Sequence, residues 1–330
     1  MDSIDKLTSE LSTSMAVSEN NVYDEHPHFS KYKNIDKLSE KQRNRREEFL
    51  EKQSNARDQF LNRFRDLYDP GFDDGDTSAQ SPSPMETGES AGGETGKRKR
   101  RSHGKGGFAD CLMLSEWLID IPATLSKEWI MVPCPVGKRV IVVAKRGETK
   151  AYNKGGRLIA TFKSDLPGGG PSERAGCTML DCIMKTNTLY ALDLLIWKDN
   201  PYTASDFPCR RFVLQSRLEE MPQTLASKSY KFVTLPQCPC TVEDMTQLMK
   251  TEFDFELDGL LFYFSEAFYT PGQTPLVGWL KPFMLTEILG VVVDEKYSST
   301  NGEFCSSQQF IDKYNKDHNF KSSIKPAATE

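Results

Sequence analysis

The alternation of apolar and polar positions is densest between residue 108 and about residue 295, where short apolar runs are separated by polar turns. Runs of this length that are rich in Val, Ile, Leu and aromatic residues predict β-strands. Three stretches with apolar residues at helical spacing predict helices instead. This order predicts an antiparallel-rich α+β body and not a βαβ array. The predicted strands are EWIMVPC (128–134), RVIVVAK (139–145), RLIATF (157–162), LYALDLLIW (189–197), KFVTLP (231–236), GLLFYF (259–264) and GVVVDE (290–295), and the predicted helices lie at 111–120, 240–253 and 284–290.

A basic amphipathic segment ahead of this body predicts one long helix. Ser39 and Gln42 have the spacing of a capping box, and Asp69-Pro70-Gly71 is a stop signal, so about seven helical turns should lie between them. Apolar residues recur there at near-helical spacing, and Arg and Lys cover most of the remaining surface. Two interpretations are open: a solvated helix that packs on the body, or a detachable helix that a partner binds.

The first 25 residues are polar apart from a sparse apolar stripe of Ile4, Leu7, Leu11, Met15 and Val17. These spacings place several apolar side chains on one side of a short helix, but they supply too little area for the segment to fold alone. The stripe is either a frayed terminus or a leucine-rich export signal whose apolar residues enter pockets on an exportin.

Between the basic helix and the body, the composition changes to Gly, Ser, Asp, Thr and Pro, which predicts a disordered, flexible linker. The linker ends in a basic run from Lys97 to Arg101, which could be a nuclear localisation signal, an RNA contact or a solvated segment. Beyond Tyr297 the chain is polar, with one helix predicted over 307–316. The expected divisions are an N-terminal segment (1–25), the basic helix (26–69), the linker (70–107), the body (108–295) and a polar C-terminal tail (296–330).

Composition and charge sharpen this division. Only 38% of the 330 residues are hydrophobic and the mean hydropathy is -0.54, so part of the chain is not expected to fold alone. No run approaches the roughly 18 apolar residues of a membrane span. The N-terminus also lacks a secretory pattern, so we expect a cytosolic or nuclear protein with no membrane association. From Lys31 to Arg65, eleven Lys and Arg stand against six Asp and Glu in a chain of net charge -5, so this basic arm suggests an acidic partner.

Residues for metal binding and catalysis are sparse. The eight cysteines include no C-x-x-C pair and the four histidines have no metal spacing, so we expect no metal and no cofactor. The body contains no phosphate-binding or nucleophile motif, and its Gly168–Gly170 run lies in a polar loop with no helix behind it. The histidines lie outside the body or at its margin, so acid–base catalysis would rest on other residue types.

Three blocks of the body occur in the order found in messenger-RNA guanylyltransferases and DNA ligases, and the chain resembles their nucleotidyltransferase fold. The blocks are CPVGKR (134–139), MLDC (179–182) and Asp258-Gly259 followed by GWLKP (278–282). Cys134 stands where that family has its nucleophilic lysine, and Asp181-Cys182-Ile183 replaces its Asp-Gly-Glu. The groups that form the covalent adduct and hold the metal are therefore missing. The resemblance implies a pocket that binds a guanosine cap and does not catalyse its formation.

A closer resemblance, to the snurportin family of import adaptors for spliceosomal U small nuclear ribonucleoproteins (U snRNPs), covers nearly the whole chain. It includes the start HPHFSKYK (26–33) of the basic helix and the apolar spacing at residues 4–17. Six blocks in the correct order are more specific than any one of them. They are LMLSEWLIDIP (112–122), CPVGKR (134–139), LPGG (166–169), LDCI (180–183), DGLLFY (258–263) and TPLVGWLKP (274–282).

This resemblance implies a site for the 2,2,7-trimethylguanosine cap, built around two tryptophans. Trp279 would stack on the base, whose N7-methyl group gives it a positive charge that favours an indole face. Trp117 would pack beside the dimethylated N2 group, which has no N–H left to donate, and such an apolar wall leaves the donors of a monomethyl cap unpaired. The resemblance further implies Leu114, Ser115 and Cys134 around the base, and Arg139, Lys154 and the backbone around Gly137 at the phosphate bridge, with Lys138 in the same block.

For the basic helix, the resemblance implies an importin-β-binding domain whose Arg and Lys pair with carboxylates on a helical-repeat receptor. Arg43, Arg45 and Arg46 match the basic cluster of that domain, although Asn44 interrupts it. Because of this interruption, importin binding is expected to rest more on Lys31, Lys33, Arg57 and Arg63.

For the N-terminal stripe, the resemblance implies binding to an exportin together with Ran-GTP.

We therefore interpret the chain as a monomeric, non-enzymatic adaptor that shuttles between cytoplasm and nucleus. The body would capture the trimethylguanosine cap of a U snRNA in its snRNP, the arm would recruit importin-β, and the exportin would return the empty adaptor. Two alternatives remain: an active or residual guanylyltransferase or other cap-modifying enzyme, and an importin-binding scaffold that does not bind RNA.

Overall fold

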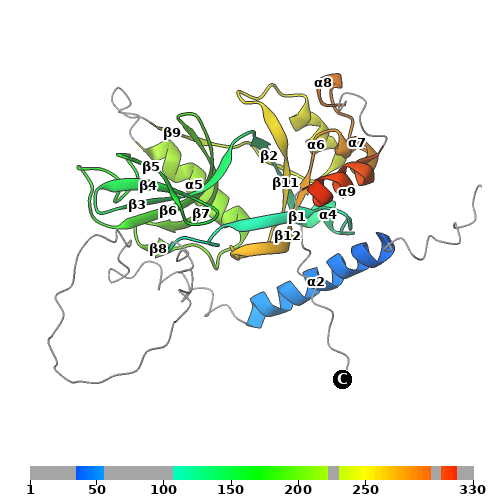
Figure 1. Ribbon diagram of the computed structural model, residues 1–330, viewed down its shortest axis with the longest axis horizontal. Helices are drawn as coiled ribbons and strands as arrows, with labels where there is room; N and C mark the ends of the chain where they lie inside the picture. The colour runs from blue at the N-terminus through cyan, green and yellow to red at the C-terminus, as the bar shows by residue number, and fades with distance from the viewer. Residues whose placement is uncertain (1–34, 56–106, 222–229, 299–305, 318–330) are drawn as a thin grey trace, which may run out of the picture.

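The computed structural model describes residues 35–55, 107–221, 230–298 and 306–317 (Figure 1). The body is built from two β-sheets, which are joined through a shared apolar cluster and carry helices on their outer faces. This confirms the antiparallel-rich α+β class. None of the described helices has both the length and the apolar content needed to cross a membrane.

The smaller sheet has five strands in the order β1-β12-β11-β2-β10. β1 runs parallel to β12, and the other pairings are antiparallel. Among the described residues β1 pairs with β12 alone, so it forms an edge of this sheet. The strand bounds are β1 Met113–Trp117, β2 Trp129–Pro135, β10 Cys238–Pro239, β11 Leu257–Phe264 and β12 Gly272–Leu280.

The larger sheet has seven strands, with β5-β4-β3-β6-β7-β8 in order and β9 paired in parallel with β7. Its central strands are almost wholly buried, because both of their faces are covered. The strand bounds are β3 Lys138–Lys145, β4 Glu148–Asn153, β5 Leu158–Phe162, β6 Cys177–Lys185, β7 Thr188–Trp197, β8 Asn200–Pro201 and β9 Lys231–Thr234.

Three apolar clusters hold these layers together. The first joins the two sheets, with Val132 and Leu261 on one side and Ile141 and Leu192 on the other. The second lies on the outer face of the smaller sheet under α6, α7 and α9, and the third lies between the larger sheet and α5. The helix bounds are α2 Ile35–Asn55, α4 Leu125–Glu128, α5 Phe207–Glu220, α6 Val242–Met249, α7 Met284–Leu289, α8 Glu295–Ser298 and α9 Ser307–Asp317.

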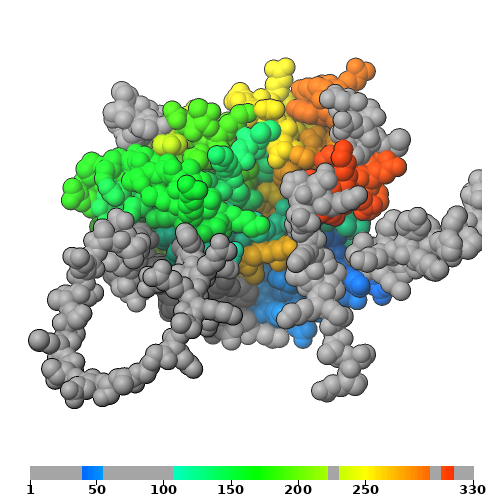
Figure 2. Space-filling model, in the orientation of Figure 1, coloured from blue at the N-terminus to red at the C-terminus, as the bar shows by residue number. Residues whose placement is uncertain are grey.

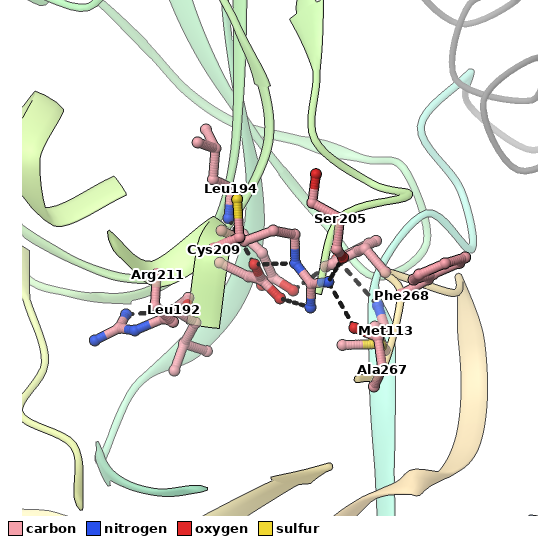
Figure 3. Close-up of polar contacts among 12 residues, drawn as sticks. Met113, Leu192, Leu194, Ser205, Cys209, Arg211, Ala267 and Phe268 are labelled. Carbon is pink, nitrogen blue, oxygen red and sulfur yellow. Dashed lines mark hydrogen bonds and ion pairs between the residues drawn. The ribbon is translucent and has the colours of Figure 1, made fainter. Parts of the chain in front are cut away.

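A fully buried ion pair fixes α5 on the larger sheet. Arg210 of α5 forms two hydrogen bonds with Asp193 of β7, of 2.8 and 2.9 Å, and neither side chain is exposed. The same guanidinium donates to the carbonyl oxygens of Ser205 and Ala267, at 2.6 and 2.7 Å (Figure 3). Ala267 follows β11 of the smaller sheet, so the pair also ties the two sheets together. Next to it, Arg211 donates to the carbonyl of Leu192 (Figure 3).

Most of the predicted strands are confirmed, and so are the helices predicted near residues 240, 284 and 307. The helix predicted over 111–120 is wrong, because this segment forms β1 and pairs with β12. The strand predicted over 290–295 is also wrong: the chain there is irregular up to the start of α8. Helix α5 was not predicted, although Asp206 caps it by accepting from the backbone N–H of Cys209 and Pro208 stands in its first turn.

The predicted basic helix is present as α2, but it begins at Ile35, before the predicted cap. Ser39 and Gln42 lie inside the helix, and their side chains bind the body instead of the helix N-terminus. The capping-box prediction is therefore wrong, because tertiary partners take up both polar groups. Three predicted parts lie outside the described residues. They are the N-terminal segment, residues 56–69 of the basic helix and residues 70–106 of the linker.

We predict that Arg210→Met lowers the free energy of unfolding by about 3–5 kcal/mol, because it leaves the buried Asp193 carboxylate without its ion-pair partner. The double variant Arg210→Met/Asp193→Leu should recover much of this loss. Urea denaturation followed by circular dichroism measures both, with Arg217→Gln on the exposed side of α5 as the control. A double variant no more stable than Arg210→Met would contradict the unpaired-charge explanation.

Candidate functional site

A cavity of about 360 Å³ opens where the smaller sheet meets β3 and β6 of the larger sheet. Neighbouring strands of the smaller sheet each contribute to its wall: Trp117 from β1, Trp279 from β12, Leu261 from β11 and Cys134 from β2. Its volume lies in the range typical of small-ligand sites. The remaining lining residues are Ser115, Glu116, Pro135, Gly137, Arg139, Ile183, Asp258, Gln273, Lys281 and Tyr314.

The two tryptophans of this cavity are direct neighbours across the parallel pair of strands. Trp117 and Trp279 are register partners in the β1–β12 ladder, which brings their backbones to the spacing of adjacent strands. Tyr314 of α9 meets the Trp117 ring edge-on, with centroids 5.3 Å apart and planes at 85°. The ammonium of Lys281 lies 5.7 Å from the centroid of the Trp279 ring and is held there by Asp258, at 2.6 Å. The cavity thus combines aromatic faces with a positioned ion pair.

Arg139 supplies a half-buried positive charge in the cavity. Its guanidinium forms two hydrogen bonds with Asp181, of 2.6 and 2.8 Å, and donates to the carbonyl of Met113 at 3.2 Å. Asp181 also accepts from the Tyr269 hydroxyl at 2.7 Å. Burial alone would disfavour the guanidinium, but the Asp181 carboxylate outweighs it and raises the pKa of Arg139 well above its usual value. Arg139 is therefore a permanent, oriented cation.

Cys134 occupies the floor of the cavity as a neutral thiol. It is 1% exposed, and its Sγ donates to the carbonyl of Val132 at 3.5 Å. Burial raises the pKa of the thiol to about 12, and the nearby Arg139 only partly offsets this. Because the thiolate is the nucleophilic form, Cys134 is not activated for attack at neutral pH.

Gly259 allows the Trp279 ring to lie where it does. A Cβ atom at this position would stand 2.2 Å from Cζ2 of the Trp279 indole and 2.8 Å from the carbonyl oxygen of Leu280. No side chain can be accommodated at such a distance without moving the ring. The Asp258-Gly259 pair noted in the sequence therefore serves the cavity twice, through the carboxylate that holds Lys281 and through the space left for Trp279.

A second, more open groove of about 670 Å³ adjoins the cavity and shares Arg139 with it. Lys138 and Lys154 line this groove and not the cavity itself. Leu114, which was predicted beside the base, packs against the cluster between the sheets. The predicted residues that the structure brings together in the cavity are Ser115, Trp117, Cys134, Gly137, Arg139 and Trp279.

Several lining residues were not predicted. Lys281 and Asp258 lie inside blocks that were recognised in the sequence, so their place next to Trp279 was a usable signal. Glu116 lies in the segment for which the apolar spacing predicts a helix, and its place in the cavity depends on the pairing of β1 with β12. Tyr314 comes from α9, more than thirty residues beyond the last block, and nothing in the local pattern connects it to the cavity.

Helix α2 docks on the edge of the smaller sheet beside this cavity. In Figure 2, the blue surface of α2 borders the gold surface of β12. The Gln42 amide donates to the carbonyl of Trp117 at 2.8 Å and accepts from the backbone N–H groups of Ile119 and Asp120, at 3.2 and 2.9 Å. Gln53 makes the same kind of paired contact further along the helix, with the Glu266 carbonyl and the Phe268 N–H. The two glutamines thus satisfy backbone groups at and beyond the sheet edge.

Ion pairs complete this docking. Asp120 accepts from Ser39 at 2.8 Å and pairs with Arg46 at 3.1 Å, and Arg43 lies at 3.9 Å. Arg45 pairs with Glu116, which also lines the cavity. The three arginines predicted to bind importin-β therefore lie against the body. The other predicted importin-binding residues, Lys31, Lys33, Arg57 and Arg63, and the predicted exportin-binding stripe lie outside the described residues.

The docking is incomplete in one respect. The Nε atoms of Arg45 and Arg46 are buried without a hydrogen-bond partner among the described residues. Each such group costs about 1–3 kcal/mol. Burial also lowers the pKa of Arg46, although Asp120 offsets part of the effect. The contact between α2 and the body is therefore specific, but it leaves two buried arginine N–H groups without acceptors among the described residues.

Among the described residues, no group of three or more His, Cys, Asp or Glu side chains is placed to hold a metal ion.

Two known families match separate parts of the chain. The family described as "Snurportin1, m3G cap-binding domain" matches residues 111–282, which include most of the cavity, and the family described as "Snurportin1" matches residues 26–66, which include α2. The chain belongs to the snurportin family. Its body is the cap-binding domain of that family, and α2 lies in the family's N-terminal region.

Solved structures similar to this snurportin chain include DNA ligases. The ligase domain of M. tuberculosis LigD is 15% identical, with a TM-score of 0.37, over 51% of this chain and 58% of that one. A mycobacterial DNA ligase D complexed with ATP and MES has the same identity and TM-score, over 51% and 59% of the two chains. A Lig E DNA ligase is 14% identical, with a TM-score of 0.35, over 52% and 68%. The chain thus spans less than two thirds of the first two of these structures.

We predict that Gly259→Ala displaces the Trp279 indole, because the added methyl group would overlap the ring. The expected result is a changed tryptophan emission and a loss of stability of about 1–3 kcal/mol, typical of overpacking. Fluorescence and urea denaturation measure these effects. Gly155→Ala in the exposed turn after β4, where a Cβ would meet nothing closer than 3.5 Å, is the control. An unchanged emission spectrum would show that the ring does not depend on this glycine.

Proposed function

We propose that this snurportin binds the 2,2,7-trimethylguanosine cap of U snRNAs in the cavity between the sheets and acts as a nuclear import adaptor. The observation that carries the proposal is the pairing of Trp117 and Trp279 on adjacent strands within one cavity. Family membership supports the ligand, and the chemistry of the cavity fits it.

The aromatic wall suits a methylated guanine. The N7-methylated base carries a positive charge, which gains cation–π attraction from an indole in addition to stacking. Trp279 is half-buried, so part of its surface remains for a ligand. The apolar surroundings of Trp117, with Tyr314 beside it, accept a dimethylated amine without loss and would leave the N–H donors of a monomethyl cap without partners.

The phosphates of the cap would meet the basic side of the site. Arg139 is oriented by Asp181 and faces both the cavity and the adjoining groove. Lys138 and Lys154 extend the positive charge away from the tryptophans. Charge-assisted hydrogen bonds from such groups are the usual means of holding a triphosphate bridge.

The chemistry of the cavity favours recognition over catalysis. Cys134, at the position of the nucleotidyltransferase lysine, is buried and protonated, and Asp181 is already bound to Arg139 and Tyr269. Neither is free to form a covalent adduct or to hold a metal. We therefore propose a binding protein and not a guanylyltransferase. A covalent nucleotidyl adduct after incubation with labelled GTP and Mg²⁺ would overturn this part of the proposal.

The N-terminal arm would connect the capped RNA to the transport receptors. Arg43, Arg45 and Arg46 would leave Glu116 and Asp120 of the body for carboxylates on importin-β. The unsatisfied Nε atoms of Arg45 and Arg46 favour this exchange, because a receptor can provide the missing acceptors. The apolar residues at 4–17 would recruit an exportin with Ran-GTP, so that the monomeric adaptor shuttles between cytoplasm and nucleus.

For the cap, we expect Trp279→Ala to weaken binding of a trimethylguanosine cap dinucleotide by about 1–3 kcal/mol, the contribution of one stacked base. Fluorescence quenching measures the affinity, and the monomethyl dinucleotide should bind more weakly to the unmodified protein. Trp197→Phe, which changes an indole in the cluster under α5, is the matched control. Equal affinity for the two caps would refute the specificity argument, and no affinity for either would favour an importin-binding scaffold without RNA.

For the arm, we expect Asp120→Asn to increase the affinity of the full chain for importin-β, because it removes the negative charge that Arg43 and Arg46 share. Loss of about 1–2 kcal/mol of docking energy corresponds to roughly a 5- to 30-fold gain in released arm. Surface plasmon resonance measures the affinity, and Asp294→Asn controls for the change of charge, because Asp294 lies beyond α7 and its ion pair within the described residues is with Lys296. An unchanged affinity would mean that docking of α2 does not compete with the receptor.

A further inference from the structure

We infer that the open groove beside the cavity binds the RNA strand that follows the cap, with Arg157, Leu158 and Ile159 as contacts beyond the cap itself. This inference rests on the proposed function, since it takes the cap to lie in the cavity. It goes beyond that function, because it concerns the nucleotides that follow the triphosphate and residues that do not line the cavity. The groove is lined by Lys138, Arg139, Asn153, Lys154, Gly155, Arg157, Leu158 and Ile159.

The first support is the continuity of the groove with the cavity. Arg139 lines both, so a chain that leaves the cavity past this guanidinium enters the groove directly. Gly137 and Lys138 are consecutive residues at the turn into β3, and one lines the cavity while the other lines the groove. The two hollows therefore form one path across the end of β3.

The second support is charge. Four of the eight lining residues are Lys or Arg, and none is Asp or Glu. Lys138, Lys154 and Arg157 are exposed, and within the part of the chain that the structure describes they form no ion pair. In a protein with a net charge of -5, such a local excess of positive charge favours a polyanion.

The third support is a pair of exposed apolar side chains next to these cations. Leu158 is 47% exposed and Ile159 is 37% exposed. They are consecutive on β5, where one residue faces each side of a regular strand, yet both line the groove. A β-bulge explains this: Ala151 pairs with Ala160 and Tyr152 pairs with Leu158, which leaves Ile159 as the extra residue. An unstacked RNA base is held by stacking on a flat side chain such as an Arg guanidinium, and Leu158 and Ile159 add apolar contact beside Arg157.

The fourth support is rigidity. The Asn153 carboxamide oxygen accepts from the backbone N–H groups of Gly155 and Arg157, at 3.0 and 2.9 Å. From the other side, the Asp110 N–H donates to the carbonyl of Lys154 at 3.1 Å, and Ala109 forms a β-bridge with Gly155. The turn that presents Lys154 and Arg157 is therefore fixed before a ligand arrives, which reduces the entropy lost on binding.

The test compares two ligands on the full-length protein: the trimethylguanosine cap dinucleotide, and a single-stranded RNA of about ten nucleotides that carries the same cap. We expect the capped RNA to bind more tightly at low salt, and its affinity to fall more steeply with salt, by about 0.7 in the log–log slope for each phosphate held. Arg157→Gln should reduce this advantage and the salt slope while leaving the dinucleotide affinity unchanged. Leu158→Ser/Ile159→Ser should reduce the advantage without changing the salt slope.

Arg217→Gln removes the same charge from α5, on the opposite side of the larger sheet, and should leave both ligands unaffected. Equal affinity for the capped RNA and the dinucleotide would overturn the inference, and so would an equal loss of both in Arg157→Gln, which would place Arg157 at the cap. The dinucleotide alone tests the cavity, so failure of the proposed function shows as no dinucleotide binding. If the groove does not bind RNA, the dinucleotide binds and the capped RNA binds with no higher affinity. Unchanged melting temperatures exclude misfolding of the variants.

Discussion

The buried contact between Arg139 and Asp181 is the interaction on which the site depends. Both residues belong to the larger sheet, but the guanidinium also reaches the Met113 carbonyl of the smaller sheet, and Asp181 accepts from Tyr269. The Tyr269 hydroxyl in turn accepts from the Met113 N–H at 3.1 Å. This closed ring of polar contacts sets how far apart the sheets stand where the cavity opens. It also leaves Arg139 charged and fixed in direction, so that one residue can serve both the cavity and the groove.

A second constraint acts at the free edge of the smaller sheet. Within the part of the chain that the structure describes, β1 has a strand partner on one side, and an unpaired edge is open to association with other chains. Gln42 satisfies the backbone groups just past this edge strand, while Arg45 and Arg46 hold the acidic residues beside it. The basic arm is therefore a ligand of its own body. From composition alone, the charge of the arm suggests an acidic partner. In this structure, Glu116 and Asp120 of the same chain are that partner.

The sequence predicts the parts of this protein that depend on local pattern or on motif order. Trp279 and Cys134 lie in recognisable blocks, and the structure places them in one cavity. The segment around Trp117 was assigned to a helix because its apolar spacing fits a helix as well as an edge strand; only pairing with β12 decides between them. Tyr314 and the Gln42 contact could not be predicted, because each depends on a long-range approach that no spacing along the chain encodes.

Glu116 and Trp117 each belong both to the contact with the docked helix and to the lining of the cavity. Glu116 holds Arg45 of the arm and also lines the cavity; the Trp117 carbonyl accepts from Gln42, and Trp117 lines the same cavity. Any energetic coupling between these two events is reciprocal by thermodynamic necessity. If an occupied cavity loosens the arm by some factor, then removal of the arm tightens the cavity by that same factor. These two consecutive residues would then couple ligand binding in the cavity to release of the arm without any movement of the sheets.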